Sequence, residues 1–174
     1  DEAEAVFRDL VTRRPDNMRH LACLGIHLQR NGRATEAEPY LERSIAESRK
    51  AIERAPDNAS VHFDLGHALA GNGQIDEAIA EFRKTIELDF NYATAHSKLG
   101  ANLSLKGRGD EAIAEYRKAI ELEPYDADVH GNLGIELSRK GLRDEAIAEF
   151  RKAIELDPTN PSFQNHLQNE LSRK

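Results

Sequence analysis

Apolar residues along this chain recur three or four positions apart, in short stretches separated by turn-forming residues. Val61, Leu65 and Leu69 form one such stripe. Residues 71–73 then read Gly-Asn-Gly, and a second apolar stripe runs from 78 to 86. This spacing is typical of one face of an α-helix, and Gly-rich breaks are typical of turns. Because no alternating strand pattern appears, the sequence predicts helices throughout, about ten in all, and no sheet.

The same pattern returns with a period of 34 residues. It is visible in Leu-Gly pairs at 65–66, 99–100 and 133–134. It is visible again in nearly identical segments that begin at Asp76, Asp110 and Asp144. A period of this length is typical of stacked helical hairpins, which bury their apolar faces against one another. We expect each of these aspartates to cap the second helix of its hairpin, and Pro124 and Pro158 to end that helix.

These residues resemble the tetratricopeptide repeat. In the unit that begins at Ala59, the family's Leu-Gly pair stands at 65–66, its small residue is Ala78 and its large aromatic residue is Phe82. The resemblance implies an all-α fold, a right-handed superhelical solenoid of helical hairpins that forms one array over residues 1–174. We expect the second helix of a truncated repeat at 1–17, an elongated repeat at 18–58, regular repeats at 59–92, 93–126 and 127–160, and a C-terminal capping helix at 161–174.

Three features depart from a regular array. The unit at 18–58 is seven residues too long, and seven residues are about two helical turns, so we expect one continuous helix over 35–55. Phe90 stands where the other units have proline, so the helix over 76–89 lacks its usual stop. Because Phe7 matches the middle of a repeat, we expect the 174 residues to be a fragment of a longer protein.

Composition narrows the classes of partner. The net charge is -7 and no run of five lysines or arginines occurs, which disfavours nucleic acid. No stretch of 18 apolar residues is present, so we expect no direct insertion into a membrane. Cys23 is the single cysteine and excludes an internal disulfide framework. The compartment stays open.

Catalytic and metal sites gain no support from the sequence. Three histidines recur at one unit position, His62, His96 and His130. They are therefore about one helix spacing or more apart, too far to share one ion. Cys23 has no motif partner that would make it a nucleophile. Carboxylates on the second helices are expected to face water and pair with nearby cations, as Glu81 with Lys84. We expect no enzyme activity, no cofactor and no metal.

The side of each first helix that points away from its Leu-Gly pair is the candidate binding surface. In the tetratricopeptide repeat family, these positions line the concave groove of the superhelix, so the resemblance implies that a peptide or protein segment binds there. We call these residues the first-helix face: Arg19, Ile26, Arg30, Phe63, Asp64, His67, Lys98, Leu105, Asp128, Asn132, Ile135, Arg139, His166 and Arg173. Five are basic and two acidic, a net +3 against -7 for the chain. We expect an acidic peptide with apolar residues that anchor on Phe63, Leu105 and Ile135.

Two recognition patterns of the family do not match this sequence. One is a clamp for a pair of carboxylates at chaperone C-termini, of which only Lys98 fits, and the other is an asparagine ladder. The predicted function is therefore a non-catalytic scaffold for protein–protein interaction whose partner is unspecified. Two alternatives stay open: a structural scaffold that self-associates into a homo-oligomer, and the substrate-recognition arm of an enzyme whose catalytic domain lies elsewhere.

Overall fold

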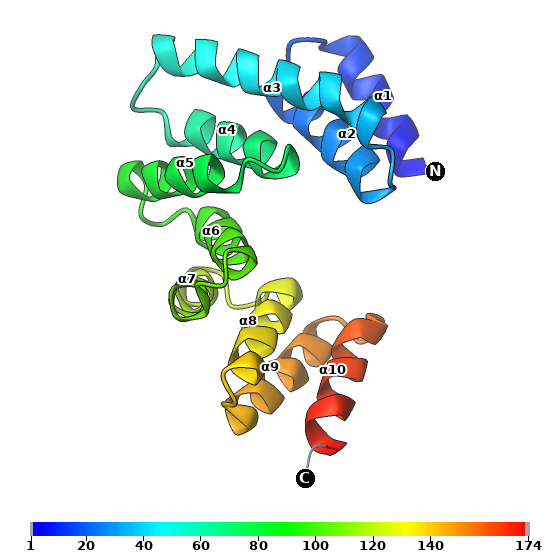
Figure 1. The fold of residues 1–174 in the computed structure, drawn as a ribbon, viewed down its shortest axis with the longest axis vertical. Coiled ribbons are helices and arrows are strands. Elements are labelled where there is room, and N and C mark those ends of the chain that lie inside the picture. The colour runs from blue at the N-terminus through cyan, green and yellow to red at the C-terminus, as the bar shows by residue number, and fades with distance from the viewer. Residues whose placement is uncertain (1, 173–174) are drawn as a thin grey trace. The chain divides into compact units, whose positions relative to one another are not determined.

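The computed structural model describes residues 2–172, and this part of the chain consists of helices joined by short turns (Figure 1). In chain order the helices are α1 (Glu2–Arg13), α2 (Met18–Arg30), α3 (Ala34–Arg54), α4 (Ala59–Gly71), α5 (Ile75–Leu88), α6 (Ala93–Leu105), α7 (Gly109–Leu122), α8 (Ala127–Arg139), α9 (Arg143–Leu156) and α10 (Pro161–Ser172). The prediction of about ten helices and no sheet is confirmed over the described range. None of these helices is both long and apolar enough to cross a membrane.

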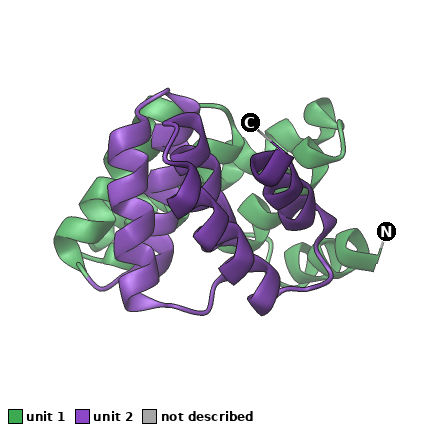
Figure 2. Cartoon of the chain, turned by 90° about the horizontal axis from the view of Figure 1, so that it is seen from below, with its two compact units in different colours: residues 1–90 green, residues 91–174 purple. Residues whose placement is uncertain are grey.

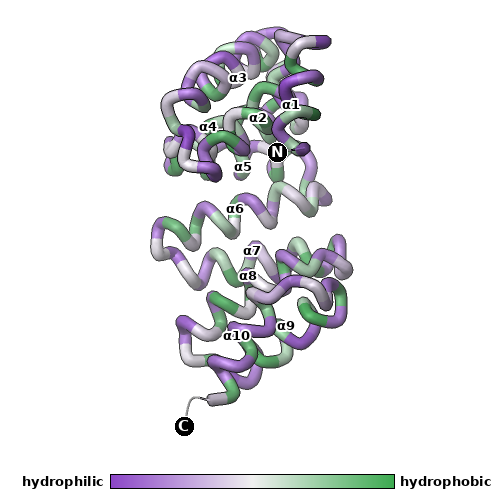
Figure 3. Tube along the Cα trace, turned by 90° about the vertical axis from the view of Figure 1, so that its right-hand side faces the viewer, coloured by the Kyte–Doolittle hydropathy of each residue, from purple (hydrophilic) through white to green (hydrophobic). Residues whose placement is uncertain are grey.

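The helices group into two compact units, residues 1–90 and residues 91–174 (Figure 2). The division falls directly after Phe90, the residue that replaces the usual proline. In each unit, the two helices of a hairpin pack most extensively against each other: α2 with α3 and α4 with α5 in the first unit, and α6 with α7 and α8 with α9 in the second. Hydrophilic and hydrophobic residues alternate along the helices (Figure 3), as amphipathic packing requires.

Close approach within each hairpin depends on the glycine of the Leu-Gly pair. A Cβ added at Gly134 would lie 2.7 Å from Cε1 of Phe150, and one added at Gly100 would lie 2.9 Å from Cε1 of Tyr116. Both rings are almost fully buried, so neither has space to move aside. The large aromatic residue of each unit therefore packs directly on the backbone of the first helix.

Helix α3 is continuous over 21 residues, which confirms the predicted long helix. Its buried positions recur every three or four residues, at Ala37, Leu41, Ser44, Ile45 and Ser48. The two extra turns thus keep the buried face aligned, as a seven-residue insertion should. Ser44 Oγ donates a hydrogen bond to the Met18 carbonyl, 2.6 Å away, which satisfies one buried hydroxyl in this contact with α2.

The ends of the helices differ in part from expectation. The prediction that aspartates cap the second helices is wrong: the N-cap residues are Gln74, Arg108 and Leu142, and none of them makes a side-chain cap hydrogen bond. The aspartates lie one position inside the first turn, where a negative charge still favours the helix dipole. Helices α7 and α9 end two residues before Pro124 and Pro158, as predicted. Helix α5 ends at Leu88 without a proline.

Candidate functional site

In the first unit, the first-helix face is formed by α2 and α4. Arg19 and Arg30 are exposed on α2. On α4, Phe63 and His67 are half-buried, whereas Asp64 is only 8% exposed. The exposed charge of this face in the first unit is therefore positive.

Arg19 and Asp64 form an ion pair that joins α2 to α4. Arg19 Nε donates to Asp64 Oδ1 at 2.9 Å and a terminal nitrogen donates to Oδ2 at 3.3 Å. The same nitrogen also donates to Ser60 Oγ at 3.1 Å. Burial raises the pKa of Asp64 above its ordinary value, and the hydrogen bond and charge of Arg19 oppose that rise. The guanidinium of Arg19 is therefore largely neutralised by Asp64 within the first unit, and less of its charge is available to a ligand.

The apolar residues of the face in the first unit also have structural roles. The rings of Phe63 and His67 stack with centroids 6.1 Å apart, and Phe63 packs against Phe82 at 5.7 Å. Ile26 packs so closely on α4 that a Cβ added at Gly71 would lie 2.5 Å from Ile26 Cγ1. Ile26 thus belongs to the contact between α2 and α4 as much as to the surface.

In the second unit, the predicted face residues are spread over α6, α8 and α10. Leu105 is 74% exposed, while Lys98, Asn132, Ile135 and His166 are half-buried. The ring of His166 stacks on Phe150 with centroids 5.4 Å apart. Asp128 and Arg139 are exposed, and Arg173 lies outside the described residues.

Arg139 is bound to a buried carboxylate that the sequence reasoning missed. It contacts the carboxylate of Glu136, which is only 4% exposed, and donates to Ser104 Oγ at 3.1 Å. Ser104 Oγ in turn donates to Glu136 Oε1 at 2.6 Å. The same contact recurs one repeat later between Ser138 and Glu170. The signal in the sequence is a serine followed by a glutamate 32 positions on, in two successive units.

A hollow of about 310 Å³ adjoins this contact, between α6, α8 and the start of α7. Its charged lining consists of Arg139 and Lys140 with Glu136 and Asp110, and Lys140 contacts the carboxylate of Asp110. The two cations are thus matched by two carboxylates, and this hollow offers no net charge to a ligand.

The repeated histidines hold the hairpins together. In each case Nδ1 of the histidine lies close to a carboxylate oxygen of a glutamate on the second helix of the hairpin. The pairs are His62 with Glu81 at 2.7 Å, His96 with Glu115 at 2.7 Å and His130 with Glu149 at 2.6 Å. Nε2 of His62 lies 2.8 Å from the Pro56 carbonyl, and Nε2 of His130 lies 3.1 Å from the Pro124 carbonyl. The expected pair of Glu81 with Lys84 is wrong, because Lys84 pairs with Glu87 at 3.0 Å. The described residues contain no group of three or more side chains that could hold a metal ion.

Comparisons with known proteins agree with this architecture. Family profiles described as tetratricopeptide repeat match residues 17–89 and 127–160, and a profile described as TPR repeat matches residues 103–141. The chain belongs to the tetratricopeptide repeat family. A sequence comparison with curated proteins gives no match.

Solved structures share the fold over most of the chain. A crystal structure of MamA matches with a TM-score of 0.65 and 27% identity, covering 89% of this chain and 86% of that one. TTC0263, described as a thermophilic TPR protein of Thermus thermophilus, matches with a TM-score of 0.72 and 20% identity, covering 97% of this chain and 88% of that one. The second likeness shows the fold alone.

Proposed function

We propose that this chain binds a segment of a partner protein on the first-helix face, and that the segment combines carboxylates with apolar side chains. Tetratricopeptide repeat proteins in general are non-catalytic scaffolds for protein–protein interaction, and the chain belongs to that family. The finer proposal, the face and the acidic character of its ligand, rests on the residues of the face themselves.

One observation supports the acidic ligand above the others. Arg30 is exposed, Lys98 is half-buried, and neither forms an ion pair with another described residue, whereas Arg19 and Arg139 are bound to buried carboxylates. Arg30 and Lys98 are therefore the cations that a ligand carboxylate can reach without breaking an internal pair. Leu105, 74% exposed, is the apolar side chain of the face in the second unit on which a segment could anchor.

The test reverses these two charges. The partner is first recovered by affinity capture with the full chain, and its affinity is then measured for an R30E/K98E double variant. We expect a loss of at least about tenfold and a weaker dependence of the association rate on salt. A matched control, R14E/R151E, changes the same charge at two exposed arginines outside the face and should cost less than about twofold. Equal losses in the two double variants would move the interface away from the first-helix face.

Arg139 is unsuitable for this test. A glutamate at that position would place a second carboxylate beside the buried Glu136 and remove its cation, so the variant would lose stability as well as charge. A weakened interaction could then report unfolding of the second unit rather than lost recognition.

A further inference from the structure

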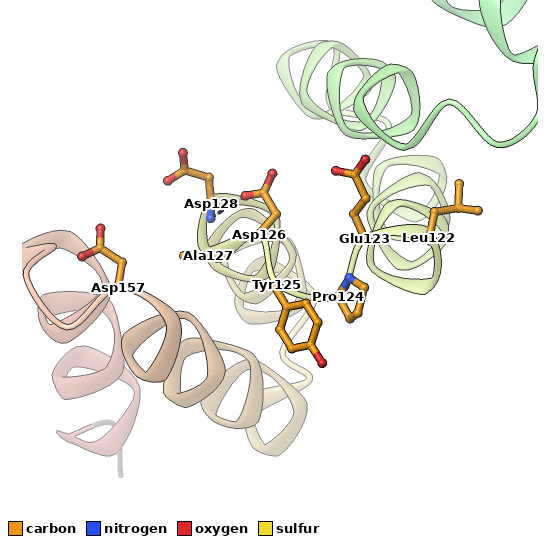
Figure 4. Close-up of a pocket in the computed structure, with 8 residues that line it drawn as sticks. All are labelled: Leu122, Glu123, Pro124, Tyr125, Asp126, Ala127, Asp128 and Asp157. Atoms are coloured by element: carbon orange, nitrogen blue, oxygen red, sulfur yellow. Dashed lines mark hydrogen bonds between the residues drawn. The ribbon is translucent and has the colours of Figure 1, made fainter.

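A second surface with the opposite charge lies in the second unit. The turn between α7 and α8 and the end of α9 line an open hollow of about 680 Å³ (Figure 4). Its lining is half apolar and half acidic: Leu122, Glu123, Pro124, Tyr125, Asp126, Ala127, Asp128 and Asp157. Asp128, which the sequence assigned to the first-helix face, is part of this hollow.

The charge of the hollow is not balanced by the protein. Its lining contains four carboxylates and no cation, and none of the four forms an ion pair with another described residue. Two of them have structural roles, because Asp126 accepts hydrogen bonds from the Asp128 and Val129 amides and Asp157 accepts two from Thr159. Glu123 and Asp128 are exposed and have no such role for their carboxylates.

Tyr125 is a second feature that the fold does not explain. Its side chain is 80% exposed, in a turn where the other units have polar residues, Asp57, Asn91 and Thr159. The turn therefore forms without an aromatic ring at this position. Exposed tyrosine beside apolar residues is typical of protein-binding surfaces, because its ring offers a large contact area at a small cost in side-chain entropy.

The arrangement suits an extended ligand and not a single ion. In Figure 4 the carboxylates of Glu123, Asp126 and Asp128 extend to one side of the turn, whereas the ring of Tyr125 extends to the other. No group of three or more of the described side chains converges closely enough to hold a metal ion. A chain that lies across the turn can contact both sides at once.

We propose that this hollow docks a basic segment of a partner protein. Lysine or arginine side chains of the segment lie against Glu123 and Asp128, and an apolar or guanidinium group lies on the ring of Tyr125. This surface is independent of the proposed function, because its ligand has the opposite charge and its residues, Asp128 apart, lie outside the first-helix face.

The experiment measures binding of a fluorescein-labelled peptide of arginine alternating with leucine and glycine, by fluorescence anisotropy with the full chain. An E123Q/D128N double variant removes two charges from the hollow and spares the two aspartates with structural roles. The matched control, E121Q/E155Q, removes two charges from exposed positions on α7 and α9. We expect about tenfold weaker binding for the first variant and less than about twofold for the second. Equal losses would mean that the peptide senses only the net charge, which overturns the proposal.

Tyr125 provides the second readout. Y125A should weaken binding of the same peptide about fivefold or more, and Y125F, which keeps the ring, should bind like the wild type. Spermine, a polyamine that carries several positive charges but no leucine side chains, should compete poorly with the labelled peptide for the hollow. The proposal is overturned if Y125A binds normally or if spermine competes as well as unlabelled peptide. Far-UV circular dichroism of each variant shows whether the fold is retained.

Discussion

Replacing Gly134 with leucine tests the packing on which each hairpin depends. A Cβ at this position already lies 2.7 Å from Cε1 of Phe150, closer than a carbon atom can approach without a shift. Phe150 is 1% exposed, and the ring of His166 stacks on it with centroids 5.4 Å apart. Because the ring has no free space on either side, leucine must push α8 and α9 apart.

The expected cost follows from two opposing effects. Overpacking a close helix contact costs ~1–3 kcal/mol, and a whole leucine side chain against a fixed ring places the cost near the upper end. Leucine regains ~1 kcal/mol of helix propensity relative to glycine. We therefore expect the free energy of unfolding to fall by ~2 kcal/mol. Q168L is the matched control, because Gln168 occupies the same repeat position on α10, is exposed, and should change stability by less than ~0.5 kcal/mol.

Guanidinium chloride unfolding followed by far-UV circular dichroism measures both variants. Amide hydrogen exchange locates the loss, which should be confined to α8, α9 and α10. Adding F150A to G134L should recover part of the cost, so that the two changes together destabilise less than their sum. Equal effects of G134L and Q168L, or strictly additive effects of G134L and F150A, would show that the helix faces are assigned incorrectly.

Three further predictions concern the polar contacts. Because burial raises the pKa of Asp64, its contribution to stability is greatest below the ordinary carboxyl pKa and is lost as pH rises through the folded-state pKa. The unfolding free energy of the wild type relative to D64N should therefore increase as the pH is lowered from about 7 to about 4. A difference that stays constant over this range would refute the prediction. R143A removes hydrogen bonds to the last carbonyls of α10, so exchange of amides in that helix should accelerate by an amount equivalent to ~1 kcal/mol, whereas R151A, on the exposed side of α9, should leave it unchanged. H130L removes the imidazole that contacts the Glu149 carboxylate and the Pro124 carbonyl, so the free energy of unfolding in denaturant should fall by ~1–3 kcal/mol. An unchanged free energy of unfolding would show that this histidine does not stabilise the hairpin.

Much of the fold could be predicted because its signals are local. The spacing of Val61, Leu65 and Leu69 reflects the 3.6-residue turn of a helix, and a seven-residue insertion preserves that spacing, so α3 could be predicted as one helix. The position of a helix end is a weaker signal, because the turn geometry decides which residue is the cap. Asp76 therefore looked like a cap and is one residue inside the helix.

The sequence by itself determined the helices, their pairing into hairpins and the family, because each follows from a pattern that repeats along the chain. It also predicted which residues of the first helices point away from the Leu-Gly pairs. Whether those side chains are available to a ligand depends on partners in other helices. Arg19 reaches Asp64 45 positions away, and Arg139 reaches Ser104 35 positions away.

Only the tertiary structure decided these contacts. A buried carboxylate such as that of Asp64 or Glu136 has lost its hydration, so it needs donors that neighbouring helices hold at hydrogen-bond distance. That condition depends on helix packing and on side-chain rotamers, which the periodicity of the sequence does not determine. The acidic hollow around Tyr125 is a mixed case: residues 122–128 are consecutive in the sequence, and the tertiary structure adds Asp157 at the end of α9 and the hollow itself.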